Sequence, residues 1–304
     1  MRKLKKIAEN PLILVYHFLA HSKLGKKISD ELYLKIQFFN IFHKLLNLEF
    51  PKTFSEKIQW MKLYIHHPEF TTMADKIEVK RYVSELLGEN YVIPLLGIWD
   101  KFDEIDFDLL PNQFVLKTNH DSGNVIICKD KSKLNIIKSK RILTNSLNYD
   151  YYKQGREWPY KNIRRRIFAE QFLVDESGIE LKDYKFFCFD GIVKFFKVDF
   201  NRQIEHHANY YDLNWKLLPF GEKVFPPKPN VVIEKPKNFE KMITVAEKLS
   251  KGIPFVRIDL YNINGVIKFG EMTFFPNGGF GRYEPSDADL EIGNMINLPE
   301  RKIV

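Results

Sequence analysis

The chain has 304 residues, of which 44% are hydrophobic, 28% charged and 14% aromatic, and this composition excludes a disordered chain. The net charge is +8, but residues 1–28 carry seven Lys and Arg side chains against one Glu. The rest of the chain therefore has a net charge of only +2, and we do not expect it to bind nucleic acid. The two cysteines, Cys128 and Cys188, exclude a disulfide framework and favour buried thiols in a reducing compartment.

The first segment, residues 1–28, combines its basic side chains with a short apolar run at 11–20. The run is too short to span a bilayer. The pattern imitates a secretory signal, but no A-x-A cleavage motif follows it. A basic amphipathic helix on an anionic membrane surface and an ordinary packing helix are both left open.

Residues 29–90 are predicted to be helical. Thr53 and Glu56 have the spacing of a capping box before an apolar run. A further helix is predicted from Asp75 to Leu87.

From residue 91 the pattern changes to short β-type runs at 91–99, 113–119 and 124–130, followed by a helix over about 133–147. Residues 151–166 are polar, aromatic and basic, and we expect them to form a surface loop.

The second half reads mainly as antiparallel strands. Asp190-Gly191 separates two β-type runs and Asn264-Gly265 separates another two, and both dipeptides are typical of two-residue hairpin turns. An amphipathic helix is predicted over 235–251. The whole chain is therefore predicted to be α+β, with a helical first third and a strand-rich body.

Candidate metal ligands lie on the last predicted hairpin. In PFVRIDLY (254–261), Arg257 and Asp259 share one face of the strand while apolar side chains take the other. The partner strand brings Glu271 beside them, and two carboxylates on neighbouring strands suit a hard cation such as Mg²⁺. On this pattern alone, simple pairing of Arg257 with the carboxylates on an exposed sheet face is an equal alternative.

Two further segments are candidates for nucleotide binding. Lys117 ends a predicted strand before a polar turn, in which the backbone N–H groups of Ser122 and Gly123 can cradle phosphate oxygens. Downstream, Glu170 and Asp183 are placed to accept hydrogen bonds from an amino group and a ribose hydroxyl. Each segment alone is a weak motif, and their order along the chain is the more specific signal.

That order closely resembles the ATP-grasp superfamily and, more narrowly, the TupA-like ATP-grasp family of bacterial surface-polysaccharide gene clusters. The resemblance covers about residues 28–298 and is carried by PKTFSEKIQWMKL (51–63), ADKIEVKRYV (74–83), LPNQFVLKTNHDSG (110–123), LKDYKFFCFDG (181–191), VRIDLY (256–261) and FGEMTFFPNGG (269–279). It implies an α+β ATP-grasp fold in which a helical region (29–90) precedes a small lobe (91–165) and a C-terminal lobe (166–304) that sandwich ATP.

The resemblance also implies roles for matching residues. Arg257 and Lys117 are the implied catalytic residues, and Asp259 and Glu271 the implied Mg²⁺ ligands. The implied ATP-binding residues are Lys76, Lys117, Ser122, Gly123, Glu170, Gln171, Phe172, Leu173, Asp183 and Lys185. The implied substrate-binding residues are Asn277, Gly278, Gly279 and Arg282. Thr273 stands where the superfamily usually has a metal-binding Asn, so one Mg²⁺ is expected rather than two.

The implied reaction transfers the γ-phosphoryl group of ATP to a carboxylate, giving an acyl phosphate that an amine attacks to form an amide. The expected substrates are an amino acid or other amine and a uronic acid or similar carboxylate of a capsule, O-antigen or teichuronic-type glycan. A cytoplasmic location is expected, and residues 1–28 leave open a peripheral contact with the inner face of the membrane. The sequence indicates no oligomeric state.

Several alternatives remain. A glycosyltransferase needs a DxD-type metal motif, for which Asp287-Ala-Asp289 is the candidate. A phosphotransferase would use the same ATP site without forming an amide, and a membrane-attached scaffold with a decayed site is disfavoured by the retained lysines and carboxylates. Lys185 and Lys197, on facing strands, are equally open to phosphate contact and to a solvated position.

Overall fold

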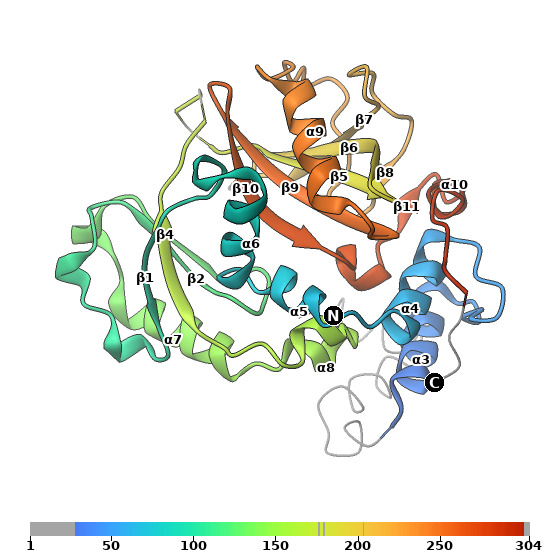
Figure 1. Ribbon diagram of the computed structural model, residues 1–304, viewed down its shortest axis with the longest axis horizontal. Coiled ribbons are helices and arrows are strands. Elements are labelled where there is room, and N and C mark those ends of the chain that lie inside the picture. Colours follow the sequence, from blue (N-terminus) through green and yellow to red (C-terminus); the bar gives the residue numbers. More distant parts are fainter. Residues whose placement is uncertain (1–27, 176, 179, 203, 301–304) are drawn as a thin grey trace, which may run out of the picture.

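A computed structural model describes residues 28–300 apart from residues 176, 179 and 203 (Figure 1). The helix or signal-like segment expected in residues 1–27 lies outside the described residues. Within residues 28–300, no helix combines the length and apolar character needed to cross a membrane.

The helices and strands alternate in blocks along the chain. The helices are α3 (Asp30–Phe42), α4 (Phe54–Tyr64), α5 (Glu69–Ala74), α6 (Glu78–Leu87), α7 (Ile136–Asn148), α8 (Tyr151–Gly155), α9 (Phe239–Ser250) and α10 (Ala288–Gly293). The strands are β1 (Leu95–Trp99), β2 (Phe114–Thr118), β3 (Val125–Cys128), β4 (Ile167–Gln171), β5 (Asp183–Phe189), β6 (Ile192–Phe200), β7 (His207–Tyr211), β8 (Gly221–Glu222), β9 (Phe255–Ile263), β10 (Val266–Thr273) and β11 (Tyr283–Glu284).

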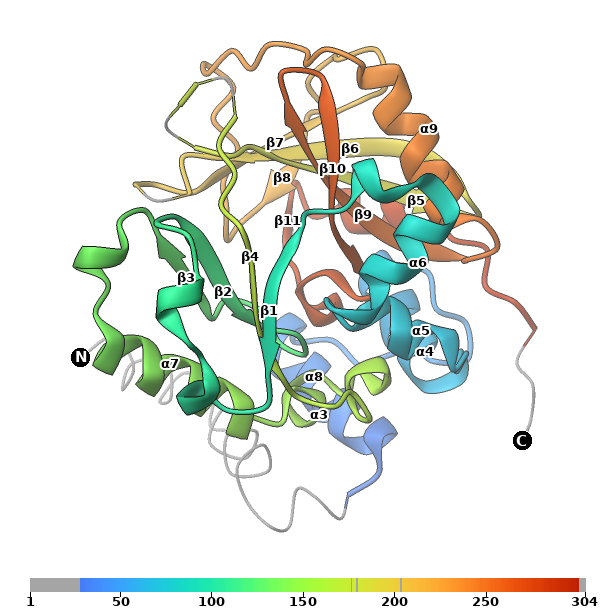
Figure 2. The same ribbon diagram turned by 60° about the vertical axis from the view of Figure 1, so that its left-hand side comes forward.

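Two antiparallel sheets form the body of the molecule (Figures 1 and 2). The small sheet has the strand order β1-β4-β2-β3 and packs against α7, whereas the large sheet has the order β10-β9-β5-β6-β7 and packs against α9. Strands β8 and β11 form a separate pair. Figure 1 shows α5 and α6 at the junction of the two sheets.

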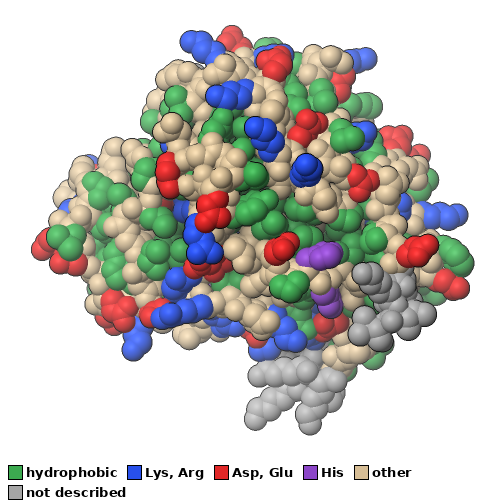
Figure 3. Space-filling model, viewed as in Figure 1, with side chains coloured by type: hydrophobic (Ala, Val, Ile, Leu, Met, Phe, Trp, Pro, Cys, Tyr) green, Lys and Arg blue, Asp and Glu red, His purple; other side chains and the backbone are tan. Residues whose placement is uncertain are grey.

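The two faces of the large sheet differ in chemistry because side chains alternate along each strand. Ile258 and Phe186 are fully buried on the face that meets α9. The opposite face carries Arg257, Asp259 and Lys185, which are also buried. The outer surface differs again, because Figure 3 shows basic and acidic side chains interspersed with apolar ones over one side of the molecule.

Local sequence signals account for several elements. The hydroxyl of Thr53 accepts from the backbone N–H of Glu56 at 3.2 Å, and the Glu56 carboxylate accepts from the N–H of Thr53 at 3.1 Å, which confirms the capping box of α4. Asp190-Gly191 connects β5 to β6 and Asn264-Gly265 connects β9 to β10. All four turn residues have positive φ, as this hairpin turn requires.

One irregularity of β10 places the candidate metal ligands. The side chain of Phe269 is buried in the core. In a regular strand, residues two apart share a face, so the side chain of Glu271 would also point into the core. The pairing of β9 with β10 instead shifts register between Phe269 and Glu271, so Glu271 stands opposite Asp259. A Cβ on Gly270 would come within 3.0 Å of the Asp259 carbonyl, which explains why the extra residue of this bulge is glycine.

Two sequence-based expectations were wrong. Strand β4 pairs with β1 and β2, so it belongs to the small sheet and the lobe boundary falls after Gln171 rather than at residue 166. The segment 151–166 is not a surface loop, because it forms α8 and a 3₁₀ helix (Trp158–Tyr160) and buries Arg156 and Glu157. Neither outcome can be read from local patterns, since both depend on which distant elements cover the segment.

Candidate active site

An arginine on the charged face of the large sheet binds two carboxylates and a hydroxyl. The guanidinium of Arg257 donates to the two oxygens of Asp259 at 2.6 and 2.7 Å. Its Nη2 also donates to Glu271 at 3.2 Å and to Thr273 at 3.0 Å. Arg257 is 8% exposed and Asp259 is 1% exposed. Arg257 and Asp259 therefore form a buried, bidentate pair with the half-buried Glu271 beside it, and not the exposed surface pair that the sequence left open.

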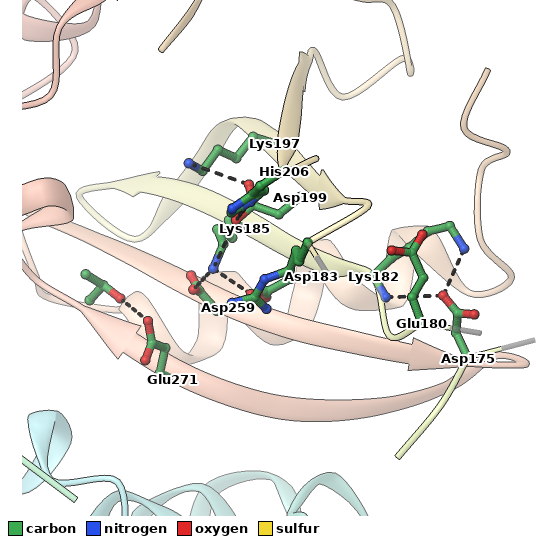
Figure 4. A network of polar contacts seen from close by, with 12 residues as sticks. Asp175, Glu180, Lys182, Asp183, Lys185, Lys197, Asp199, His206, Asp259 and Glu271 are labelled. Atoms are coloured by element: carbon green, nitrogen blue, oxygen red, sulfur yellow. Dashed lines mark hydrogen bonds and ion pairs between the residues drawn. The ribbon is translucent and has the colours of Figure 1, made fainter. Parts of the chain in front are cut away.

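Lys185 extends this cluster across the sheet (Figure 4). Its Nζ lies 2.6 Å from Asp183 and 2.6 Å from Asp259, and 3.7 Å from Asp199. On the adjacent strand, Lys197 lies 3.7 Å from Asp199. Both lysines are buried, so the solvated interpretation is wrong for each of them.

The pKa values of the two expected metal ligands shift in opposite directions. Burial raises the pKa of Asp259, and Arg257 and Lys185 only partly oppose it. For Glu271, burial is outweighed by neighbouring cations, which hold its pKa well below its usual range. In order of effect these cations are Lys76, Lys185 and Arg257. Glu271 is therefore an anion at neutral pH.

A second charged cluster lies on the small sheet. Glu170 accepts hydrogen bonds from Lys117 and, at 3.2 Å, from Lys80. Lys80 also donates to the carbonyl of Ile93 at 2.9 Å. Burial acts to raise the pKa of Glu170, but Lys117 and Lys80 outweigh it and lower the value. The carboxylate is thus held between two lysines, and its contact with an adenine amino group stays a prediction.

The remaining hinge residues lead from the small sheet to the large one. The backbone N–H of Gln171 donates to the carbonyl of Pro94 at 3.1 Å, while its side chain is exposed. Phe172 and Leu173 follow as half-buried residues. Asp183 is the first residue of β5 and pairs with Lys185. The segment from Gln171 to Asp183 therefore connects the Glu170 cluster of the small sheet to the Lys185 cluster of the large sheet.

The expected phosphate turn is built around a buried aspartate. The donors to the carboxylate of Asp121 are the side chains of Thr118, Asn124 and Ser146. Its carbonyl accepts from Lys76. Ser122 and Gly123 follow as exposed residues, and Gly123 has a φ of +93° with open space where a Cβ would stand. The backbone of this turn is therefore held in place and accessible to a ligand.

The clusters of the two sheets lie within electrostatic reach of each other. Lys76 contacts the turn of the small sheet and also depresses the pKa of Glu271 on β10. The phenol of Tyr261 on β9 has its pKa raised by burial and by Asp183, with smaller effects from Glu170 and Glu271. Charged groups from both sheets thus converge on one region.

The loop expected to bind substrate is seated on α4. Asn277, Gly278 and Gly279 have positive φ values of 50°, 60° and 69°. The side chain of Gln59 donates to the carbonyls of Gly278 and Gly279 at 3.1 and 3.0 Å. Lys62 donates to the Gly278 carbonyl at 2.5 Å. These carbonyls are occupied by donors from the protein itself, which fixes the loop.

Asn277 connects this loop to the large sheet. Its amide donates to Glu222 at 2.9 Å, and Lys197 donates to the other oxygen of Glu222 at 3.0 Å. Arg282 is exposed, and its carbonyl accepts from the backbone N–H of Lys223 at 2.9 Å. Of the four expected substrate residues, Asn277 is tied to the charged face and Arg282 lies at the surface.

Sequence reasoning missed a buried acid and base beneath the loop. Lys62 and Glu157 are 2% and 5% exposed. Burial, opposed by Glu157, lowers the pKa of Lys62 to about 8, and burial, opposed by Lys62, raises the pKa of Glu157 to about 7. No spacing pattern marks this pair. Lys80 was also missed, although it follows Lys76 by one turn of the predicted helix and that spacing was a readable signal.

The Asp287-Ala-Asp289 triplet joins two helices. Asp289 accepts from the backbone N–H and the hydroxyl of Ser55, each at 3.0 Å, and so ties α10 to α4. Asp287 lies exposed at the start of α10. One carboxylate is bonded to α4 and the other is exposed to solvent. The two carboxylates do not converge on one point, and this arrangement does not favour the metal motif of a glycosyltransferase.

A family model described as TupA-like ATPgrasp matches residues 56–297. The matched span contains both charged clusters, the turn at Gly123 and the loop at 276–279. The chain belongs to the TupA-like ATP-grasp family. The α+β ATP-grasp fold predicted from the sequence is thereby confirmed for this family member.

Solved structures resemble this TupA-like chain at low identity. D-alanine–D-alanine ligase from Bacillus anthracis is 17% identical, with a TM-score of 0.37, over 67% of this chain and 57% of that chain. The ligase from Helicobacter pylori is 12% identical, with a TM-score of 0.42, over 80% and 69%. The B. anthracis ligase complexed with ATP is 16% identical, with a TM-score of 0.43, over 74% and 63%. This chain thus spans less than two thirds of the two B. anthracis structures, and no curated protein matches its sequence.

Proposed function

We propose that the chain is an ATP-dependent carboxylate–amine ligase that works through an acyl phosphate. The observation that carries the proposal is the grouping of the buried Arg257 and Asp259 with the half-buried Glu271, whose carboxylate is also under the influence of Lys76 from the segment between α5 and α6. Fixed cations and carboxylates aimed at one region are what phosphoryl transfer requires, because charge must be held as the phosphoryl group moves.

The carboxylates of the large sheet fit a hard cation. Glu271 pairs with Asp259 across the two strands, and one oxygen each of Asp183 and Asp199 is buried without a hydrogen-bond partner in the described chain. Such oxygens favour a positively charged ligand. No group of three or more His, Cys, Asp or Glu gathers around one point in residues 28–300, so Asp259 and Glu271 would hold Mg²⁺ together with nucleotide oxygens. Mg²⁺ bound there neutralises charge on the phosphates.

The chain's own cations have distinct proposed tasks. Lys117 and the backbone of the turn at Gly123 bind the phosphates of ATP from the small sheet, and Lys76 binds them from the segment between α5 and α6. Arg257 neutralises the transferring phosphoryl group from the large sheet, and Thr273 holds its guanidinium in place through the 3.0 Å hydrogen bond. Lys185 lies between the carboxylates of Asp183 and Asp259 and reduces the electrostatic repulsion between them.

The bond changes follow from this placement. An oxygen of the substrate carboxylate bonds to the γ-phosphorus as the bond to the β,γ-bridging oxygen breaks, which gives an acyl phosphate and ADP. The amine nitrogen then bonds to the acyl carbon, phosphate leaves with the carbon–oxygen electron pair, and the nitrogen loses a proton to give the amide. Positioning and charge neutralisation are the protein's contribution to both steps.

The substrates are proposed from the family rather than from residues. A uronic acid or similar carboxylate of a bacterial surface glycan is joined to an amino acid or other amine. The reaction is placed in the cytoplasm, where ATP is supplied, and residues 1–28 are proposed to allow peripheral contact with the membrane.

A product analysis tests the proposal. The protein is incubated with Mg-ATP and panels of uronic acids and amino acids, and products are followed by mass spectrometry. ADP that forms only with a carboxylate and an amine, together with a new amide, supports the ligase. ADP with a stable phosphoester would make it a phosphotransferase, and release of a nucleoside diphosphate from a sugar donor a glycosyltransferase.

A further inference from the structure

A histidine and an aspartate form a pair at the end of the charged face of the large sheet. Asp199 belongs to β6, and His206 directly precedes β7. Phe200 pairs with His207 across these two strands. Alternation therefore puts the preceding side chains, Asp199 and His206, on the opposite face from that pair. Figure 4 shows both of them on the charged face, beside Lys185.

The imidazole of His206 is held between a carboxylate and an aromatic ring. Its Nε2 is buried and lies 3.4 Å from Asp199, and the ring of Phe225 stacks on it with 3.8 Å between centroids. Nδ1 makes no hydrogen bond with the residues that the structure describes. Since 21% of the side chain is exposed and Nε2 is not part of this fraction, the Nδ1 side of the ring is the accessible one.

The charge of Asp199 decides which ring nitrogen carries the hydrogen. Burial acts to raise the pKa of Asp199, but Lys197 and Lys185 outweigh it and hold the pKa well below its usual range. Asp199 is therefore an anion, which only accepts hydrogen bonds. Nε2 faces this anion and carries the hydrogen, so in the neutral imidazole the lone pair is on Nδ1. An accessible nitrogen with a lone pair, on a ring oriented by a carboxylate, is the arrangement of a general base.

Short contacts connect this pair with a candidate metal ligand (Figure 4). The oxygen of Asp199 that faces His206 also lies 3.7 Å from Nζ of Lys185, and that Nζ lies 2.6 Å from Asp259. Only two side chains therefore separate the imidazole from Asp259. With about 3–3.5 Å between reacting atoms, a phosphorus, an acyl carbon and an amine nitrogen fit within the reach of these contacts.

The second step of the proposed reaction needs a proton acceptor. A protonated amine has no lone pair, so it must lose a proton before it can attack the acyl phosphate. Burial acts to lower the pKa values of Arg257 and Lys185, but neighbouring carboxylates outweigh it and raise both, so neither group accepts a proton. Asp259 and Glu271 are assigned to Mg²⁺. An imidazole, in contrast, accepts protons at neutral pH.

We propose, resting on the ligase function above, that His206 is the general base of amide formation. Nδ1 takes a proton from the ammonium group of the substrate, which frees the lone pair of its nitrogen. The nitrogen bonds to the acyl carbon, and phosphate leaves with the carbon–oxygen electron pair and takes up the second proton. Asp199 is the positioning residue, because it keeps the hydrogen on Nε2 and stabilises the imidazolium, which then returns its proton to water.

The tautomer of His206 tests this arrangement without turnover. The full chain with ¹⁵N-labelled histidine is studied by two-dimensional NMR, and the signals of His206 are assigned by their absence from the His206→Gln variant. We expect the neutral ring to carry its hydrogen on Nε2. A hydrogen on Nδ1 would overturn the proposal.

Nucleophiles that differ in protonation test the role of His206 in the reaction. The protein is given Mg-ATP and uronic acids with either amino acids, whose amines are ammonium groups at neutral pH, or hydroxylamine, which is uncharged and needs no base. His206→Gln should lower kcat with amino acids by at least about a hundredfold, as loss of a general base predicts. Its rate with hydroxylamine and its affinity for a non-hydrolysable ATP analogue should be unchanged. His67→Gln, at an exposed position before α5, is the matched control and should behave like the wild type.

The outcomes separate the base from the ligase. An equal loss of rate with both nucleophiles would make the role of His206 structural, and an unchanged kcat with amino acids would make it dispensable. Either result overturns the base and leaves the ligase. Wild-type protein that forms neither an amide nor a hydroxamate would overturn the ligase, and the base with it.

Discussion

At the scale of single residues, the site depends on buried charges that compensate one another. Arg257 is shared among Asp259, Glu271 and Thr273, and Lys185 binds Asp183 and Asp259. Such charges are stable in the interior only as a set, because removing one partner leaves another charge buried and unpaired. The set therefore serves both the fold and the proposed chemistry.

Glu271→Gln separates the two roles. The substitution keeps the size of the side chain but removes the anion proposed to hold Mg²⁺, so kcat should fall by at least about a hundredfold. The circular dichroism spectrum should be unchanged, and Glu291→Gln, at an exposed position on α10, should retain full activity. Near-normal turnover of Glu271→Gln would remove the metal assignment.

Lys185→Met tests the buried network through stability. Asp183 and Asp259 would lose their shared cation, and we expect the free energy of unfolding in urea to drop by about 3–5 kcal/mol. Lys194→Met, at an exposed position on β6, should change it by less than about 0.5 kcal/mol. Equal changes in the free energy of unfolding for the two substitutions would mean that the contacts of Lys185 do not stabilise the fold.

The acid beneath the loop predicts a pH dependence. Burial raises the pKa of Glu157 to about 7 from an ordinary value of 4.5, so the folded state holds the proton more tightly than the unfolded one. This contribution to the free energy of unfolding is complete below pH 4.5 and is lost as the pH rises to about 7, which amounts to about 3 kcal/mol. The stability difference between wild type and Glu157→Gln should therefore change across pH 4.5–7, and a constant difference would contradict the burial argument.

At the scale of elements, the loop at 276–279 shows how a segment is fixed by its neighbour. A Cβ on Gly279 would stand 2.4 Å from Ile58 and 2.5 Å from Gln59, and Gly279 has a φ of +69°. Gly178 has nearly the same φ, +70°, but open space around it. The two glycines share their backbone conformation and differ in packing.

This pair yields a matched prediction. Gly279→Ala should be less stable than Gly178→Ala by about 1–3 kcal/mol, because both carry the same backbone strain and only the first is overpacked against α4. Thermal unfolding of the two variants measures the difference. Identical melting temperatures would show that the loop is not seated as described.

Elements marked by local chemistry were predictable, and those set by distant contacts were not. The capping box at Thr53 and the hairpin at Asn264-Gly265 follow from side-chain hydrogen bonding and positive φ, which are properties of the residues themselves. The placement of β4 in the small sheet and the burial of Glu157 depend on tertiary packing. The pairing of Arg257 with Asp259 was visible from alternation, but the bulge that turns Glu271 toward them was not.

At the scale of the whole molecule, two sheets each bring half of a charged site. Lys117 and the turn at Gly123 belong to the small sheet, Arg257 and Glu271 belong to the large one, and Lys76 at the junction reaches both. The resemblance identified these residues in order along the chain, whereas Lys80 and Lys62 emerged only from the fold. Transfer of a phosphoryl group to a carboxylate is the central claim for this arrangement.

The fate of the carboxylate oxygen tests that claim most directly. The protein is given Mg-ATP, amino acids and uronic acids labelled with ¹⁸O in the carboxylate, and the released phosphate is analysed by mass spectrometry. An acyl phosphate predicts ADP and inorganic phosphate that carries one ¹⁸O from the substrate. Unlabelled phosphate, AMP with pyrophosphate, or no nucleotide product with any of these acids would contradict it.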